Sequence, residues 1–195
     1  MTAITNAHHE WAVVDRLRAM LEEQPHKKYN VTQAYGLCVA ILAWVMQRIR
    51  TTEEQAQSPE DRTAVSLMKK LKKQKIESSP WCLQKDVNKG QESSDFDFKG
   101  YSAFCFLKWL RNASCHGDAR NVFPINNREE LVGFEFRSTA RGDDRERAVF
   151  LCEADLRKIG IVLASQYCEA LQNVSVFPNN FANEAQTINE KRIAT

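Results

Sequence analysis

The chain has 195 residues, a hydrophobic share of 43% and a formal net charge of +2 at pH 7. The hydrophobic share excludes an intrinsically disordered chain, and the small charge gives no argument for nucleic-acid binding unless basic residues cluster locally. The length fits a single domain that buries its own core without metal or disulfide support, which we assign to residues 1–176, with a loosely held tail over residues 177–195.

Two helices are predicted in the first 50 residues. Apolar side chains recur at helical spacing over about residues 7 to 23, ahead of Pro25: Trp11, Val14, Leu17 and Leu21. The next helix runs to about Arg50, with Asn30 or Thr32 as its N-cap. Its apolar character is wider than a stripe, which predicts a position at the centre of a helical bundle.

A third helix is predicted from the segment Ser58–Asp61, which combines a capping serine, a proline at the first helical position and two acids near the positive end of the helix dipole. The helix ends in a basic tract, and four of its lysines are candidate contacts for an RNA backbone: Lys69, Lys70, Lys72 and Lys73. A solvated helix face explains the same lysines. Residues 77–99 follow as a long loop, and such a loop in a compact domain is more often functional or mobile than idle.

The second half of the chain combines two further helices with a hairpin. The segment Tyr101–Cys115 is apolar and aromatic and stops at His116–Gly117, because Gly is the usual residue just past a helix end. Strands at Val132–Phe136 and Ala148–Cys152 predict a hairpin over about residues 131–152, and a last amphipathic helix follows it. The predicted fold class is therefore mainly α, an up-and-down bundle of four to five helices with a small β-hairpin insertion.

Cysteine usage and hydropathy bear on the cellular compartment. None of the six cysteines forms a Cys-x-x-Cys pair, so no zinc or redox motif is predicted. The longest apolar run, Leu37–Met46, is about half of the roughly 20 residues that a spanning helix needs, and the N-terminus lacks the layout of a signal peptide. We expect reduced cysteines, no membrane association, no metal or cofactor, and a cytoplasmic location.

The segment Arg111-Asn112-Ala113-Ser114-Cys115-His116 carries residues suited to RNA cleavage. Cleavage by the ribose 2′-OH needs a base for that hydroxyl, an acid for the leaving 5′-oxygen and positive charge at the phosphate. His116 titrates near neutral pH and can transfer protons. Arg111 can hold phosphate in a bidentate fork, and Asn112 can bond phosphate or fix the imidazole tautomer. The Arg-to-His spacing alone is weakly informative, because it recurs by chance in a chain of this composition.

The wider pattern is Leu-Arg-Asn-Ala-x-x-His-Gly at a helix end, followed by the strand Val-Gly-Phe-Glu-Phe. It resembles HEPN domains over about residues 30–173, with the specific part confined to residues 107–136. The resemblance implies a metal-independent endoribonuclease with Arg111, Asn112 and His116 as catalytic residues. It further implies a symmetric homodimer in which two such motifs face each other, a role as a toxin or in phage defence, and, for some members, an antitoxin protein as partner.

Helical geometry restricts how the motif can act. Five residues of an ideal helix rotate about 500°, so Arg111 and His116 would lie roughly 140° apart. They converge on one phosphate only if His116 has left the helix or if two copies meet at a dimer axis. A Cys115–His116 nucleophilic pair is not expected, since adjacent helical side chains diverge by about 100°.

Other functions explain the same residues. Some HEPN domains bind RNA or nucleotides without cutting, or are modified by a partner at a Tyr two residues after the His, where this chain has Asp118. A purely structural helical dimer is the third possibility. There, His116 stabilises a helix dipole and Arg111 pairs with an acid such as Glu129 or Glu130.

Overall fold

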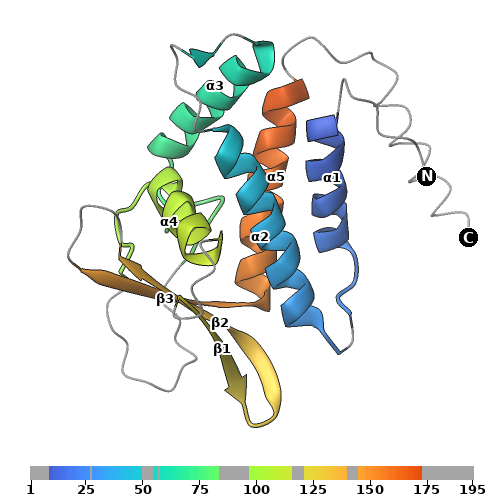
Figure 1. Cartoon of the computed structure of the whole chain (residues 1–195), viewed down its shortest axis with the longest axis vertical. Coiled ribbons are helices and arrows are strands. Elements are labelled where there is room, and N and C mark those ends of the chain that lie inside the picture. Colours follow the sequence, from blue (N-terminus) through green and yellow to red (C-terminus); the bar gives the residue numbers. More distant parts are fainter. Residues whose placement is uncertain are drawn as a thin grey trace, which may run out of the picture.

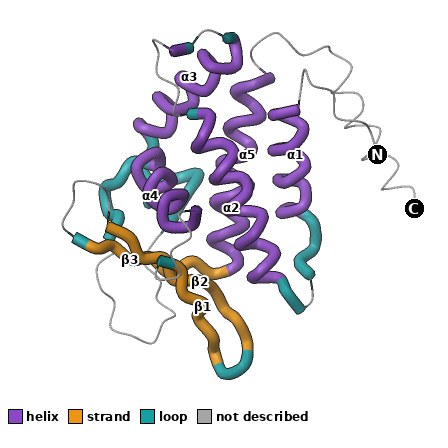
Figure 2. Tube along the Cα trace, viewed as in Figure 1, coloured by secondary structure: helices purple, strands orange, loops and turns teal. Residues whose placement is uncertain are grey.

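Five helices pack beside a three-stranded antiparallel sheet in the computed structural model, which describes residues 9–26, 28–49, 55–56, 58–83, 97–115, 121–139 and 145–172 (Figure 1, Figure 2). The helices are α1 (His9–Glu22), α2 (Asn30–Arg48), α3 (Pro59–Lys73), α4 (Ala103–Cys115) and α5 (Glu153–Gln172). The strands are β1 (Val122–Asn127), β2 (Glu130–Thr139) and β3 (Glu146–Cys152). The predicted mainly helical class is confirmed, and the predicted hairpin is part of a larger sheet.

Helix α2 occupies the centre of the helical layer, as its broad apolar character predicted. It packs against α1, α4 and α5, and its fully buried side chains include Cys38, Ile41 and Val45. Helix α5 comes close to its neighbours at Gly160, where an added Cβ would lie 2.4 Å from Leu21 Cδ1. A glycine at this position therefore lets the helices approach each other.

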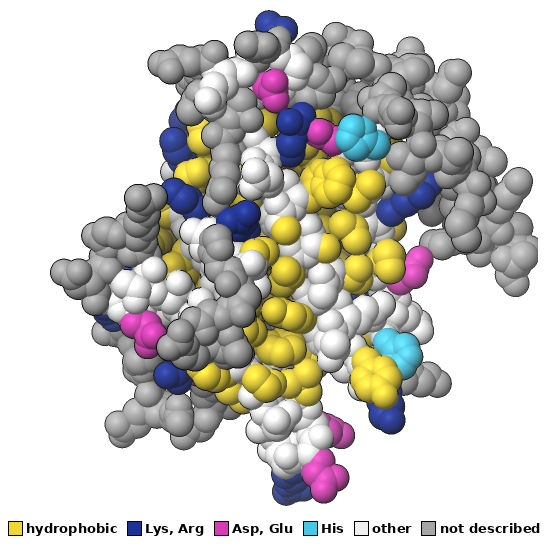
Figure 3. Space-filling view, viewed as in Figure 1, with side chains coloured by type: hydrophobic (Ala, Val, Ile, Leu, Met, Phe, Trp, Pro, Cys, Tyr) yellow, Lys and Arg dark blue, Asp and Glu magenta, His cyan; other side chains and the backbone are white. Residues whose placement is uncertain are grey.

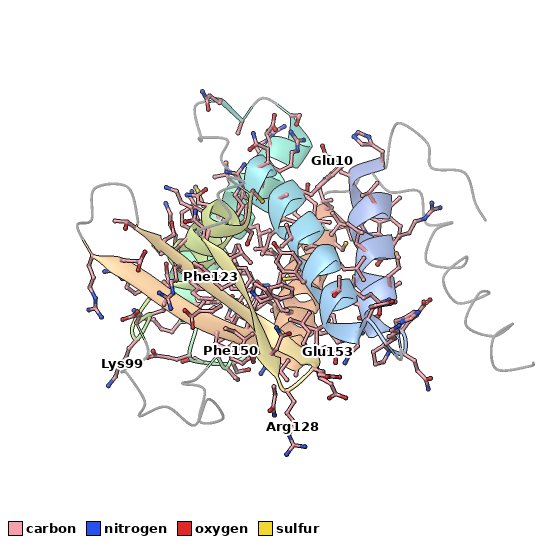
Figure 4. All side chains as sticks on the ribbon, turned by 60° about the horizontal axis from the view of Figure 1, so that its bottom comes forward. Glu10, Lys99, Phe123, Arg128, Phe150 and Glu153 are labelled. Atoms are coloured by element: carbon pink, nitrogen blue, oxygen red, sulfur yellow. The ribbon has the colours of Figure 1, made fainter. Side chains whose placement is uncertain are left out.

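Polar contacts define the relative directions of α1, α2 and α5. Tyr167, near the end of α5, donates a hydrogen bond to Glu10 at the start of α1, and Arg48 at the end of α2 pairs with the same carboxylate. At the other end of the layer, the Asn30 amide donates to Glu153, so that α2 and α5 start together (Figure 4). Helices α2 and α5 therefore run parallel to each other and antiparallel to α1.

Of the predicted starts of α2 and α3, one is confirmed and the other was wrong. The start of α3 is confirmed: Ser58 Oγ accepts from the Asp61 amide at 3.1 Å, and the Asp61 carboxylate accepts from the Ser58 amide at 3.3 Å. The prediction of Asn30 or Thr32 as the cap of α2 was wrong. The N-cap is Tyr29, without a side-chain capping bond. The Asn30 side chain instead bonds Glu153 across the bundle, so the tertiary contact replaces the local one.

The segment predicted as a long loop over residues 77–99 is described at its two ends, and these ends belong to the core. Trp81 and Phe98 are fully buried, and Trp81 Nε1 donates to Gln74 Oε1 at 2.8 Å. A β-bridge between Lys75 and Ser102 holds the ends together. The predicted tail over residues 177–195 lies outside the described residues.

Strand β1 was not predicted. Among the described strands it pairs with β2 alone, and β2 lies at the centre of the sheet between β1 and β3. Because β1 is an edge strand, it tolerates Pro124, which has no amide to donate. The inward row Val122, Phe136 and Val149 packs toward the helices, so the sheet closes one end of the core. None of the described helices is long and apolar enough to cross a membrane.

Candidate functional site

Helix α4 presents two different faces. Phe106, Trp109 and Ala113 are buried, as expected for core residues of an aromatic helix. The opposite face carries side chains at positions i, i+4, i+7 and i+8, which lie on one side of an α-helix: Phe104, Lys108, Arg111 and Asn112. Burial of the first face thus orients the second toward a cavity.

The cavity has a volume of about 680 Å³ and lies where α2, α3 and α4 meet the end of the sheet. One part of its wall is apolar and comes from three helices: Met46, Ile49, Met68 and Phe104. The other part is polar or cationic and comes from α4 and the sheet: Lys108, Arg111, Asn112, Asn121, Ser138 and Thr139. A cavity of this size, largely preformed and with a few convergent polar groups, is typical of a small-ligand site.

The end of β2 is held beside α4 by a buried tryptophan. Trp109 Nε1 donates a hydrogen bond to the Ser138 carbonyl at 3.1 Å. This bond attaches the last residues of β2 to the core face of α4. Ser138 and Thr139 consequently border the same cavity as Arg111, although about 27 residues separate them in the chain.

Arg111 has an unusual set of partners. Its Nη1 donates to Asn112 Oδ1 at 3.1 Å and its Nη2 to Gln47 Oε1 at 3.4 Å, while its Nε is buried without a hydrogen-bond partner. No described carboxylate pairs with it, so the possible pairing with Glu129 or Glu130 is not found. Both partners are neutral amides, and the guanidinium therefore keeps its charge and spare donors for an anion.

Lys108 adds a second cation to the same wall. It lies one helical turn before Arg111 and is exposed. Within the described part of the chain, none of the side chains that line the cavity is acidic. The cavity wall is therefore positively charged, and a phosphate group would meet no acidic side chain among these residues.

The four lysines predicted as RNA contacts have different surroundings in the structure: Lys69, Lys70, Lys72 and Lys73. All four are exposed on α3. Lys72 Nζ lies 5.3 Å from the centre of the Phe104 ring, at the apolar end of the cavity. Lys70 pairs with Glu169 of α5 at 4.0 Å, and Lys69 borders a separate shallow pocket beside Arg62. Of these four, Lys72 is the one with a cation–π contact to a described residue of the cavity wall.

Of the remaining motif residues, the structure describes Cys115 but not His116. Helix α4 is described as far as Cys115, and both His116 and the predicted helix end at His116–Gly117 lie outside the described residues. Desolvation raises the pKa of the Cys115 thiol, and Arg111 opposes this shift only in part. The thiol is therefore protonated near neutral pH, which agrees with the expectation that it is not a nucleophile.

Sequence reasoning identified Arg111 and Asn112 but missed Lys108, Gln47 and the sheet residues. The i, i+4 spacing of Phe104 and Lys108, in register with the motif, was the signal available for Lys108. No group of three or more His, Cys, Asp or Glu that could hold a metal ion occurs among the residues that the structure describes. Comparisons of the chain with protein-family models, with curated proteins and with solved structures found no match.

Proposed function

We propose that this protein is a metal-independent endoribonuclease of HEPN type, in which Arg111 and Asn112 bind the scissile phosphate and His116 transfers protons. The observation that carries the proposal is the environment of Arg111. Its guanidinium lines a cavity, and among the described residues its hydrogen-bond partners are two neutral amides and its buried Nε–H has none. A guanidinium in this state is suited to a phosphate, whose oxygens accept the donors that the protein leaves unused.

The proposed reaction uses the nucleophile that RNA itself carries. The ribose 2′-oxygen forms a bond to phosphorus while the bond from phosphorus to the 5′-oxygen breaks. One proton leaves the 2′-hydroxyl and one reaches the 5′-oxygen, which leaves as a hydroxyl. The products are a 2′,3′-cyclic phosphate and a 5′-hydroxyl end. His116 serves one of the proton transfers, and Arg111 with Lys108 stabilises the charge that develops on the phosphate oxygens.

We propose a homodimer as the active form, supported by the outer face of α2. Gly36 and Ala40 are exposed on this face, with open space around Gly36, and Trp44 is only partly buried. Hydrophobic side chains gather near the middle of the molecular face on which α2 lies (Figure 3). Gln47, the partner of Arg111, lies on the same face of α2 near its end. A two-fold contact through this face would bring the two Arg111 sites close together, as a composite site requires.

The experiment that tests the proposal is cleavage of labelled RNA by the full chain with excess EDTA present. We expect His116→Ala to lose at least about 100-fold in rate while its circular dichroism and melting temperature stay those of the wild type. Mass spectrometry of the wild-type products should find cyclic phosphate ends. Full activity of the His116→Ala variant would overturn the proposal.

The dimer has a separate test. Ala40→Glu places a charge on the outer face of α2 and should yield a monomer in size-exclusion chromatography with light scattering, together with a loss of cleavage. Met20→Glu is the matched control, because it adds the same charge at an exposed hydrophobic residue of α1. A monomeric Ala40→Glu variant with wild-type cleavage would exclude the composite dimeric site.

A binding module without cleavage is the second candidate, because Lys108 and Arg111 could hold an anion without any proton transfer. It predicts that the wild-type chain binds RNA but leaves it intact, and that Arg111→Ala weakens this binding. Roles as a toxin, in phage defence or with an antitoxin follow from the resemblance to HEPN domains alone. Induced expression in a bacterial host, with His116→Ala as control, would test the toxic role through growth arrest.

A further inference from the structure

The cavity is divided along its length, and this division suggests what it holds. Phe104 lies seven residues before Arg111 on the same face of α4, which corresponds to roughly 10 Å along the helix axis. Lys108 lies between them. The cationic end and the aromatic end are therefore separated along one helix, as the phosphate and the base are separated within one nucleotide.

The apolar end is built from side chains that suit a flat aromatic ligand. Phe104 supplies a ring, and Met46 and Met68 supply polarisable thioethers from α2 and α3. Bases stack on aromatic side chains whatever their sequence, and methionine sulfur packs favourably against ring edges. Inorganic phosphate would contact none of these groups, so the cationic end alone does not account for the apolar wall.

The sheet side of the cavity adds hydrogen-bonding groups. Asn121, Ser138 and Thr139 offer an amide and two hydroxyls, each able to donate and to accept. Such groups can bond the edge of a base or a ribose hydroxyl. Lys72 Nζ, 5.3 Å from the centre of the Phe104 ring, adds a cation at the aromatic end that could contact a second phosphate of an RNA strand.

We infer that the cavity is a subsite for one ribonucleotide unit, which holds the phosphate at Lys108 and Arg111 and packs the base against Phe104 and Met68. The inference rests on the proposed function for its choice of RNA as the source of that nucleotide. It makes Phe104 a binding residue for the base, distinct from the groups that bind the phosphate.

Isothermal titration calorimetry of the full chain tests this inference without any cleavage. The probes are the four ribonucleoside 3′-monophosphates, the matching nucleosides and inorganic phosphate. At least one nucleotide should bind about tenfold or more tightly than inorganic phosphate and than its own nucleoside. Equal affinities for nucleotide and inorganic phosphate would overturn the inference, whatever the behaviour of the variants.

Variants then assign the two ends. Phe104→Ala should lower nucleotide affinity toward that of inorganic phosphate and leave phosphate affinity unchanged, whereas Arg111→Ala should weaken both. Phe104→Leu keeps an apolar side chain and should fall between Phe104→Ala and the wild type. Phe123→Ala is the matched control, because Phe123 lies on β1 outside the cavity wall, beneath Arg137. Wild-type nucleotide affinity in Phe104→Ala would overturn the inference.

The two proposals fail in different ways. Tight nucleotide binding that depends on Phe104, in a chain that leaves RNA intact, would refute the ribonuclease and support the subsite. RNA cleavage that depends on His116, with the same products and rates in Phe104→Ala, would support the ribonuclease and refute the subsite.

Discussion

Two arginines in neighbouring parts of the molecule have opposite environments. Arg48, at the end of α2, pairs with Glu10 at 2.9 Å and with Asp61 at 3.5 Å. Among the described residues, Arg111 on α4 donates hydrogen bonds to the amide oxygens of Asn112 and Gln47 and pairs with no carboxylate. Gln47 and Arg48 are adjacent in α2, so consecutive residues of one helix contribute to the two regions.

The difference between the two regions separates a structural charge from one that is available to a ligand. Around Arg48 the carboxylates come from α1 and α3, and Tyr167 of α5 also bonds Glu10 at 2.8 Å, so one guanidinium helps to join four helices. Around Arg111 the described residues provide no acid. A cation without an acidic partner among the described residues, in a cavity large enough for a small ligand, is the expected signature of an anion site.

Removal of Arg111 should have the largest effect on function. We expect Arg111→Ala to lower the rate of RNA cleavage by at least about 100-fold, because a donor to the developing phosphate charge is lost. The free energy of unfolding should change by less than about 1 kcal/mol, because Asn112 and Gln47 can bond water instead. Arg111→Lys keeps the charge but not the fork, and should lose about tenfold. Cleavage assays and urea denaturation measure the two effects, and normal cleavage by Arg111→Ala would contradict the prediction.

Replacement of Arg48 should have the opposite result, which is a loss of stability without a loss of cleavage. Arg48→Met leaves Glu10 and Asp61 without their cation, and we expect a loss of about 2 kcal/mol in the free energy of unfolding, discounted for the partial exposure of the pair. Cleavage per folded molecule should stay at the wild-type level. Arg18→Met is the control: Arg18 pairs with Asp15 within α1 alone, so its loss should cost less than about 1 kcal/mol. Equal costs for the two variants would show that Arg48 does not join the helices.

A substitution that gives Arg111 an acidic partner, like the partners of Arg48, should have a smaller effect on ligand binding. Asn112→Asp places a carboxylate where an amide oxygen already accepts from Arg111 at 3.1 Å. The new pair should neutralise Arg111 and weaken the binding of mononucleotides by about tenfold, with stability unchanged or slightly raised. Calorimetry with a ribonucleoside monophosphate measures the effect. Asn112→Ser, which removes the amide without adding a charge, should weaken binding less, and equal losses would mean that charge is not the cause.

The helical layer could be predicted from sequence where local signals decide the structure. The capping box at Ser58–Asp61 and the apolar spacing of α1 act within one or two turns, and both predictions agree with the structure. The cap of α2 could not be predicted, because Asn30 bonds Glu153, which is 123 residues away in the chain. Trp81 and Phe98 looked like loop residues for the same reason, since only tertiary packing places them in the core.

The residues of the candidate site also differ in whether the sequence could predict them. Arg111 and Asn112 could be found because adjacent residues and a helix end define the motif. Ser138 and Thr139 could not be found, because their position depends on the register of β2 and on its bond to Trp109. The four lysines of α3 could not be ranked from sequence, since the rotation of α3 about its axis decides which of them lies over the Phe104 ring, as Lys72 does.

The last prediction concerns the cysteine thiols, whose burial differs between the helical layer and the end of α4. In the helical layer, burial raises the pKa of Cys38 and of Cys168 to about 12. In the last turn of α4 Cys115 is exposed, and desolvation raises its pKa less. In the unfolded chain a thiol titrates near pH 8.5 to 9. Above that pH the unfolded state releases protons that the folded state retains, so the free energy of unfolding falls as the pH rises toward 12.

Each of the two buried thiols should therefore cost about 1 to 2 kcal/mol of stability at pH 10 relative to pH 8, and the cost should disappear when the thiol is removed. Urea denaturation of Cys38→Ala and Cys168→Ala at both pH values measures this, with Cys115→Ala as the control that keeps most of the wild-type pH dependence. Tyr167 adds a loss of the same sign above pH 10, because burial beside Glu10 raises its pKa as well. A pH dependence that Cys115→Ala removed and Cys38→Ala retained would reverse the contrast, because it would place the alkali-sensitive group at the exposed end of α4 and not in the helical core.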